Sequence, residues 1–318
     1  MTVIEAGKYP RHKVCGEFIS GRGQHVLERL GLREAFVKAG AIPARNAAFH
    51  SPVAKSQPRN LEPAALCLSR FKMDALLAEE FRRTGGDLRE GERVGPSDLD
   101  EGCVRASGRR AQPIEHGWRW FGIKMHARNL PLESDLEMHA ISAGYIGLCH
   151  LADGIVNVCG LFRSRPGQEI SIARWKSFLS ATEGVPLHER FTRASFDDTS
   201  FCAVAGLPLA PKRGQELNEC SIGDALTMIP PVTGNGMSMA FESAEIAISP
   251  LTAYHRRELS WTEARKAIAI ACDTAFSRRL AWSALLQWMM FAPLLRGKLG
   301  AIALRTDWLW RLMFASTR

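Results

Sequence analysis

The sequence predicts a mixed α/β fold, in which parallel strands and helices in one part accompany an antiparallel sheet in another. A short apolar strand ends at Gly223-Asp224 and is followed by a helix, as in α/β proteins. Apolar and polar residues alternate between Trp118 and Phe162, with turn signals between the runs, and this pattern predicts an antiparallel meander. From Trp261 onward the chain is rich in Trp, Leu, Met and Arg, which predicts a helical tail.

The composition indicates an enzyme-like globule in a reducing compartment. With 318 residues and 46% hydrophobic content, the chain can bury a large core and form two packed domains. Its eight cysteines show no C-x-x-C spacing, which argues against a metal site or disulfides and predicts cytoplasmic localisation. No signal peptide is visible, because the first residues read as a strand.

The net charge of +8 raises the question of a nucleic-acid partner. Because the basic residues are spread widely and no nucleic-acid motif accompanies them, we expect no such partner. A positive surface near an anionic cofactor, an acidic substrate or an anionic membrane accounts for the charge more economically.

The segment from Ser221 to Ala247 is the most informative part of the chain. Pro230-Pro231 makes a turn, and Gly234-Asn235-Gly236 then opens a helix, whose first N–H groups favour an anionic or carbonyl-rich ligand. The glycines make either a tight loop with no ligand or a space for one. Apolar residues recur after them at helical spacing and predict a core-facing stripe: Met237, Ala240, Phe241, Ala244 and Ile248.

This segment, with its GD…PP.TG.GM…A pattern, resembles the second flavin-contacting motif of FAD-dependent oxidoreductases. That superfamily includes geranylgeranyl reductases and aromatic-ring monooxygenases. The run VIEAGKYPRHKVCGEFIS, from Val3 to Ser20, is similar to the P-R-x-K-x-C-G loop of the geranylgeranyl reductase branch. A weaker match, from Leu68 to Gly86, resembles the arginine-bearing turn and helix of the family. The resemblance implies a Rossmann-like FAD-binding domain, an antiparallel substrate domain and a helical C-terminal tail.

One departure from the family concerns the phosphate-binding turn. Relatives begin with a strand, a G-x-G-x-x-G turn and a helix, whereas here Met1 stands almost at the second strand, so the FAD-binding domain is expected to be incomplete. Two explanations compete. Either the reported start is internal to a longer reading frame, which we favour, or the chain is a remnant with a damaged cofactor site.

The expected domains follow from these matches. The FAD-binding domain covers residues 1–110 and 206–250, the antiparallel substrate domain covers 111–205, and the tail covers 251–318. We expect local irregularity between Gly85 and Gly102, a strand end at Val104 to Arg110, where Ser107 replaces a common acid, and helix around Ile172 to Ala181.

The tail is expected to form a packed helix pair. Its apolar run from Ala281 to Leu304 is interrupted before it could span a bilayer as a simple helix, by Gln287, Pro293, Arg296 and Lys298. The alternative is an amphipathic surface that rests on a membrane or captures a lipidic substrate.

The resemblance assigns roles to thirteen residues. Glu5 would accept hydrogen bonds from the adenosine ribose, and Asp224 would bind a ribityl hydroxyl. Backbone N–H groups of the glycine-rich loop would face the flavin pyrimidine carbonyl. The expected cofactor-binding residues are Glu5, Arg11, Lys13, Cys15, Gly16, Arg70, Gly223, Asp224, Pro231, Gly234, Asn235, Gly236 and Met237.

The resulting hypothesis is an FAD-dependent oxidoreductase that reduces or hydroxylates a hydrophobic organic substrate, with NAD(P)H as electron donor. The alternative is a non-catalytic, flavoprotein-like remnant that binds a partner or lipid and no FAD. Candidate pocket-lining residues from the predicted sheet are Trp118, Trp120, His126, His139 and His150.

Overall fold

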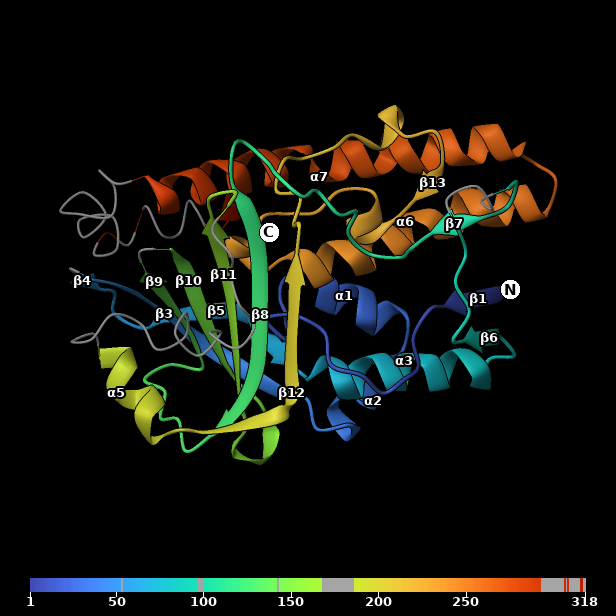
Figure 1. Cartoon of the computed structure of the whole chain (residues 1–318). Helices are drawn as coiled ribbons and strands as arrows, with labels where there is room; N and C mark the ends of the chain where they lie inside the picture. The colour runs from blue at the N-terminus through green and yellow to red at the C-terminus, as the bar shows by residue number, and fades with distance from the viewer. Residues whose placement is uncertain are drawn as a thin grey trace.

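A nine-stranded sheet forms one half of the molecule in the computed structural model (Figure 1). The structure describes residues 1–318 except 53, 96–99, 142, 168–185, 293–305, 307, 309–314 and 317–318. The strands of the sheet are β2 (Phe18–Ile19), β3 (Ile42–Ser51), β4 (Ala54–Lys55), β5 (Arg59–Cys67), β8 (Arg119–Arg128), β9 (Leu136–Ile141), β10 (Gly144–His150), β11 (Val156–Ser164) and β12 (Ser195–Ala205).

The strand order is β12-β8-β11-β10-β9-β3-β5-β2, with β4 paired to β3. The predicted antiparallel meander between Trp118 and Phe162 is confirmed for β9, β10 and β11, whereas β8 pairs with β11 and not with β9, its neighbour in sequence. β8 pairs with β11, from Arg119 against Ser164 to Ala127 against Val156, and β9 takes β3 as its parallel neighbour. Strands from the N-terminal third therefore extend the sheet, while the division into domains stays a prediction.

Two short parallel sheets lie in the other half of the molecule. β1 (Thr2–Glu5) pairs with β6 (Asp87–Glu90), and β7 (Val104–Arg105) pairs with β13 (Cys220–Ser221). The predicted strand at Thr2 to Glu5 is confirmed. Parallel strands are usually buried on both faces, yet Val3 and Ile4 are 37% and 43% exposed. In the described part of the chain, β1 and β7 each pair along one edge only.

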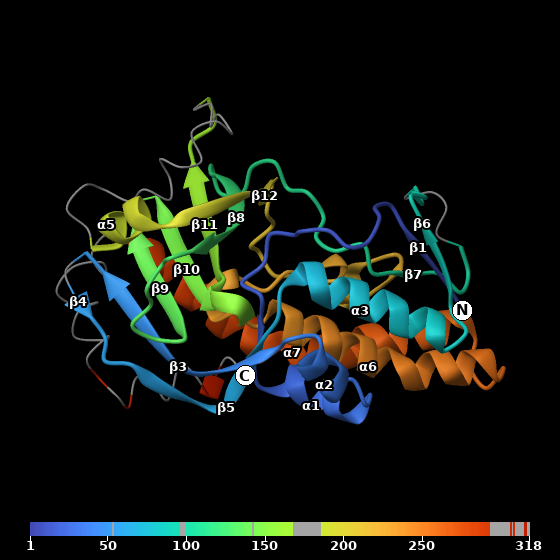
Figure 2. The ribbon, with the colours of Figure 1, turned by 90° about the horizontal axis from the view of Figure 1, so that it is seen from below.

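The described α-helices are α1 (Arg22–Arg29), α2 (Arg33–Lys38), α3 (Arg70–Arg83), α5 (Pro186–Arg193), α6 (Gly236–His255) and α7 (Trp261–Phe291). α6 and α7 lie side by side and span both halves of the molecule (Figures 1 and 2). Met239, Ile268 and Phe276 belong to the core between them. None of the described helices has the length and apolar character needed to cross a bilayer.

The start of α7 explains why the tail folds as predicted. The Ser260 hydroxyl caps the backbone N–H of Glu263, and the Glu263 side chain bonds back to Ser260, which is a capping box. The helical prediction is therefore confirmed from Trp261 to Phe291. The predicted second helix of the pair, the end of the apolar run and the predicted helix around Ile172 to Ala181 lie largely outside the described residues.

Candidate functional site

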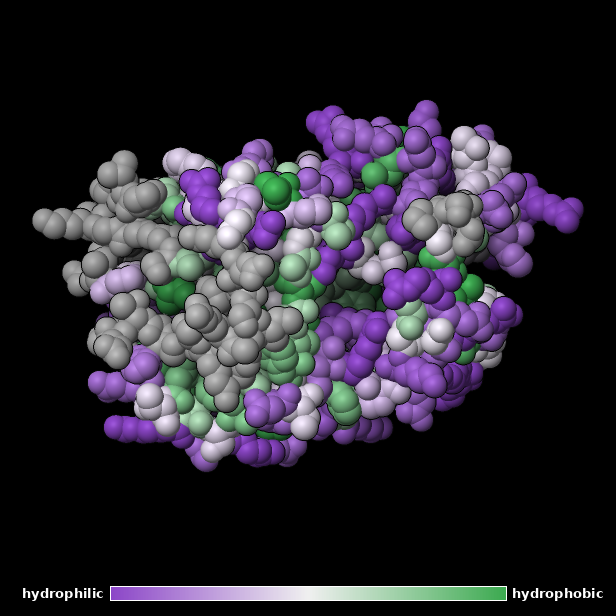
Figure 3. Space-filling view, viewed as in Figure 1, coloured by the Kyte–Doolittle hydropathy of each residue, from purple (hydrophilic) through white to green (hydrophobic). Residues whose placement is uncertain are grey.

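A cavity of about 2440 Å³ connects the parallel strands, α6 and one face of the large sheet. The molecule is hollowed on the face seen in Figure 3. Drug-sized ligands occupy pockets of about 300–1,000 Å³, so this cavity has room for more than one such molecule.

The three sequence motifs converge on this cavity. Eleven of the thirteen predicted cofactor-binding residues line it, which are Glu5, Arg11, Lys13, Cys15, Gly16, Arg70, Gly223, Asp224, Pro231, Gly234 and Met237. Asn235 and Gly236 are not among the lining residues. The motifs lie about 60 to 230 positions apart in the sequence and meet because of the fold.

Glu5 ends β1 and is held by its own loop. Its carboxylate accepts hydrogen bonds from the Gly7 N–H at 2.8 Å, the Tyr9 hydroxyl at 3.0 Å and Arg11 Nη2 at 2.7 Å. Burial alone would raise the pKa of Glu5, but these partners together hold it below its ordinary value. The carboxylate is ionised at neutral pH and fixed at the edge of the cavity.

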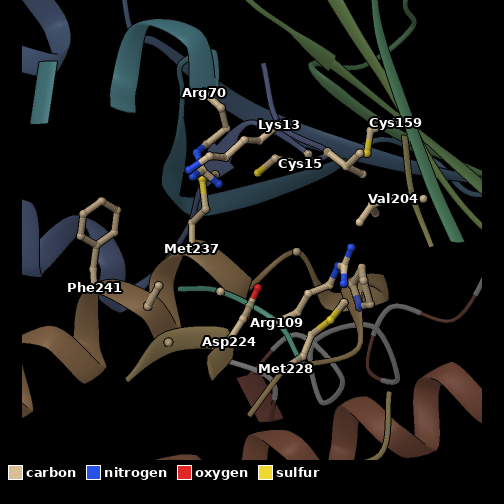
Figure 4. A pocket seen from close by; sticks show the side chains of 18 of the residues that line it. Lys13, Cys15, Arg70, Arg109, Cys159, Val204, Asp224, Met228, Met237 and Phe241 are labelled. Atoms are coloured by element: carbon tan, nitrogen blue, oxygen red, sulfur yellow. The ribbon is translucent and has the colours of Figure 1, made fainter. Parts of the chain in front are cut away.

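Arg70 and Lys13 share one buried carboxylate. Arg70 makes a bidentate contact with Asp74, at 2.6 and 2.8 Å, and Lys13 Nζ lies 3.0 Å from the same side chain. Asp74 stands four residues after Arg70 on α3, so the helix itself sets this pair. Both cations point into the cavity, opposite Asp224 and Arg109 (Figure 4). Sequence reasoning missed Asp74.

Phe18 occupies the space between two of the predicted loops. A Cβ added at Gly234 would lie 2.2 Å from the Phe18 ring, and one added at Gly16 would lie 3.0 Å from it. Gly234 also has a φ of 64°, which favours glycine. The ring of the protein's own phenylalanine therefore accounts for the glycine at 234, independently of any ligand.

The start of α6 is tied to β2. Buried Asn235 accepts a hydrogen bond from the Ser20 hydroxyl at 2.9 Å, and Ser238 Oγ donates to the Ser20 carbonyl at 2.6 Å. The Asn235 side chain therefore anchors the helix start and is turned away from the cavity.

The apolar stripe predicted on α6 lines the cavity, and the expectation that it faces the core is confirmed only for Met237 and Phe241, which also pack against the buried cluster around Phe36. Met237, Ala240, Phe241, Ala244 and Ile248 all line the cavity, and Ile248 is 50% exposed. The buried positions of α6 are instead Ser238, Met239, Glu242, Ser243 and Ala247. Buried Glu242 is neutralised by Arg279 of α7, through contacts of 2.7 and 2.6 Å. This ion pair allows a polar face to pack inward.

Asp224 lies in a short 3-10 turn, Gly223–Ala225, directly after β13. The Gly223 N–H donates to Ser243 Oγ at 2.8 Å, which fixes the turn against α6. Burial raises the pKa of Asp224 to about 6, although Arg70 and Arg109 act in the opposite direction. The Asp224 carboxylate makes no hydrogen bond with the described part of the chain and is aimed into the cavity (Figure 4).

Arg109 is a further cavity residue that sequence reasoning missed. The run from Val104 to Arg110 was predicted as a strand end, but nothing in it distinguished one arginine from the next. The structure distinguishes the arginines, because Arg105 and Arg110 both contact Glu219, while Arg109 extends into the cavity (Figure 4).

The sheet contributes an apolar wall. Met138, Tyr145, Leu161 and Leu207 line it, together with Met289 of α7. The five predicted sheet residues Trp118, Trp120, His126, His139 and His150 do not line the cavity, so that prediction is wrong. Side chains alternate along a strand, and His139 points to the face opposite to its neighbour Met138.

Two buried charge networks lie beside the cavity. Glu17 contacts His126 Nε2 at 2.7 Å and Lys124 Nζ at 3.3 Å, and Lys124 donates to His12 Nδ1 at 2.9 Å. Burial and, to a smaller extent, the positive charge of Lys124 lower the pKa of His12 to about 4.

The second network has similar chemistry. Glu137 contacts His139 Nε2 at 2.7 Å and Arg190 Nη1 at 2.9 Å. In each network two histidines and a glutamate could hold a metal ion, but a lysine or arginine already neutralises the carboxylate. The predicted absence of a metal stays a prediction.

No protein-family model matches the sequence, and a search of curated proteins finds no significant match. Solved structures do match. p-Nitrophenol 4-monooxygenase PnpA from Pseudomonas putida DLL-E4 superposes with a TM-score of 0.71 at 15% identity, over 99% of this chain and 90% of that one. A single-substitution variant of HpxO from Klebsiella pneumoniae, complexed with FAD, gives a TM-score of 0.72 at 13% identity, over 99% and 96%.

A halogenase matches equally well. The myxobacterial chondrochloren halogenase CndH, an FAD-dependent halogenase, gives a TM-score of 0.70 at 16% identity, over 100% of this chain and 84% of that one. At such low identities the likeness concerns the fold. The chain has the fold of the FAD-dependent monooxygenases and halogenases.

Proposed function

We propose that the chain is an FAD-dependent oxidoreductase that hydroxylates or reduces a hydrophobic organic substrate. One observation carries the proposal: motifs from three distant segments, matched to flavoproteins by sequence, line a single large cavity. The shared fold with FAD-dependent enzymes supports it. Within the superfamily, we propose that the chain belongs to the geranylgeranyl reductase branch, because of the loop from Tyr9 to Gly16.

The donor set of the cavity fits FAD. Asp224 is an acceptor for hydroxyl groups, and Arg70, Lys13 and Arg109 supply positive charge for a diphosphate. When bound, the flavin supplies the redox chemistry, and the electrons would come from NAD(P)H. The chain's own residues bind and orient, and the apolar wall of Met138, Leu161 and Met289 would exclude water and hold a hydrophobic substrate.

Two observations favour the alternative, a remnant that binds no FAD. The edges of β1 and β7 are unpaired in the described part of the chain, and Phe18 fills the space beside Gly234. Peripheral contact of the C-terminal helices with a membrane stays a proposal.

The absorbance of the purified protein separates the two functions. The proposed enzyme is expected to carry flavin absorption bands, or to gain them with added FAD in proportion to protein. NAD(P)H under anaerobic conditions should then bleach the bands. A protein that stays colourless at high FAD concentration, while its circular dichroism shows a folded chain, contradicts the proposal and supports the remnant.

A further inference from the structure

We infer that His50, Glu137 and His139 form a site for one divalent transition-metal ion of the zinc type, bound through two imidazole nitrogens and a carboxylate oxygen. The site uses none of the residues assigned to the flavin or to the apolar wall, so the inference is independent of the proposed function. The spacing of the cysteines does not bear on it, because none of the three ligands is a cysteine.

The register of two strands brings the three side chains together. β3 and β9 are parallel neighbours, and His50 is the direct partner of His139. Glu137 precedes His139 by two residues, so both side chains lie on the same face of β9. The two imidazole rings stack with their centroids 4.2 Å apart. His139 Nε2 lies 2.7 Å from Glu137 Oε2, and His50 Nε2 lies 4.0 Å from the same oxygen.

These distances are close to those of a tetrahedral metal site. Zinc binds imidazole nitrogen and carboxylate oxygen at about 2.0–2.2 Å, so two ligand atoms of one ion lie about 3.3–3.6 Å apart. The contact of Glu137 with His139 would lengthen, and that with His50 would shorten, by less than about 1 Å each to reach this range. The proton between His139 Nε2 and Glu137 would be released when the ion binds, because metal ligands must be deprotonated.

An unpaired nitrogen distinguishes this network from the first one. In the first network, the buried Lys124 ammonium lies 2.9 Å from His12 Nδ1 and 3.3 Å from the carboxylate, so it takes the place that an ion would need. In the second network, Arg190 neutralises Glu137 but leaves His50 Nε2 buried, with no hydrogen-bond partner among the described residues. Buried polar atoms are normally paired, so this nitrogen indicates a missing partner.

The charge around this nitrogen favours a cation as the missing partner. Ser134 Oγ and two nitrogens of Arg190, Nε and Nη2, are also buried and unpaired among the described residues. An anion could accept from these donors, but it would lie against the fully buried carboxylate of Glu137, which repels it. A water molecule in the fourth position of the ion could bind these donors instead. His50 and Glu137 border the cavity, which gives an ion a path to the site.

The test is a Co²⁺ titration of the whole protein, followed by visible difference spectra and by calorimetry, with Zn²⁺ as the competitor. The unmodified protein is expected to bind one Co²⁺ per chain, with the visible bands of a four- or five-coordinate ion and no near-ultraviolet band from a cysteine thiolate. His50→Ala should weaken binding by at least about a hundredfold, because loss of an outer-shell partner alone costs about ten- to a hundredfold. Arg190→Met should strengthen binding by at least about threefold, because it removes a positive charge beside a ligand oxygen.

The matched control is His12→Ala, which removes an imidazole from the first network and should leave the affinity for Co²⁺ unchanged. Circular dichroism shows that each variant folds. Zn²⁺ should raise the thermal midpoint of the unmodified protein and of His12→Ala, but not that of His50→Ala. The inference is overturned if the unmodified protein binds no Co²⁺, if a thiolate band accompanies binding, or if the two histidine variants weaken binding equally. None of these outcomes changes the expected binding of FAD.

Discussion

Replacing Asp224 by Asn tests whether burial of the ionised Asp224 carboxylate in the cavity lowers the stability of the folded protein. The pKa of Asp224 is raised from 3.8 to about 6, chiefly by burial. Because the folded state keeps its proton to a higher pH than the unfolded state, the stability of the ligand-free protein falls as pH rises from about 4 to 6. One pKa unit corresponds to 1.36 kcal/mol, so the raised pKa of Asp224 lowers the free energy of unfolding by about 3 kcal/mol at pH values above 6.

The expected result is a pH-dependent stabilisation by Asp224→Asn. The free energy of unfolding of the variant should exceed that of the unmodified protein by about 1.5 kcal/mol at pH 5 and by about 3 kcal/mol at pH 8. Urea titrations monitored by circular dichroism measure this free energy. Near pH 4 the free energies of unfolding of the two proteins should become nearly equal. A constant difference between pH 5 and pH 8, or a variant less stable at pH 8, would refute the reasoning that burial raises the pKa of this carboxyl.

Two further substitutions test the packing around the cavity, each by the free energy of unfolding. Gly234→Ala is expected to cost about 2–4 kcal/mol, because its Cβ would meet the Phe18 ring at 2.2 Å and φ is positive. In a Phe18→Leu background the cost should fall to about 1–2 kcal/mol, and an equal cost in both backgrounds would show that the two residues do not interact. Arg279→Met should cost about 3–5 kcal/mol by leaving Glu242 buried and unpaired, whereas Arg33→Met, at an exposed pair, should cost less than about 1 kcal/mol. Similar losses for the two arginines would contradict the assigned role of the buried pair.

The sequence by itself determined several local elements and eleven of the residues that line the cavity. The strand at Thr2–Glu5, the helix that Arg70 begins and the helix that follows Gly234-Asn235-Gly236 lie where turn residues and periodicity predict them. These features depend on interactions between residues a few positions apart, so they can be read along the chain. The cofactor-binding roles stay predictions, although most of the residues line one cavity.

Only the tertiary structure decided which surfaces face the core and which face the cavity. Apolar spacing on α6 is the same whether its stripe meets a core or an open pocket, and the Glu242–Arg279 pair lets a polar face of the same helix be buried as well. The neighbours of β8, the contact of Phe18 with Gly234 and the position of Arg109 likewise join residues far apart in sequence. Burial and pairing are set by partners that periodicity does not record, which is why the sequence could indicate residues that line one cavity but not how they pack.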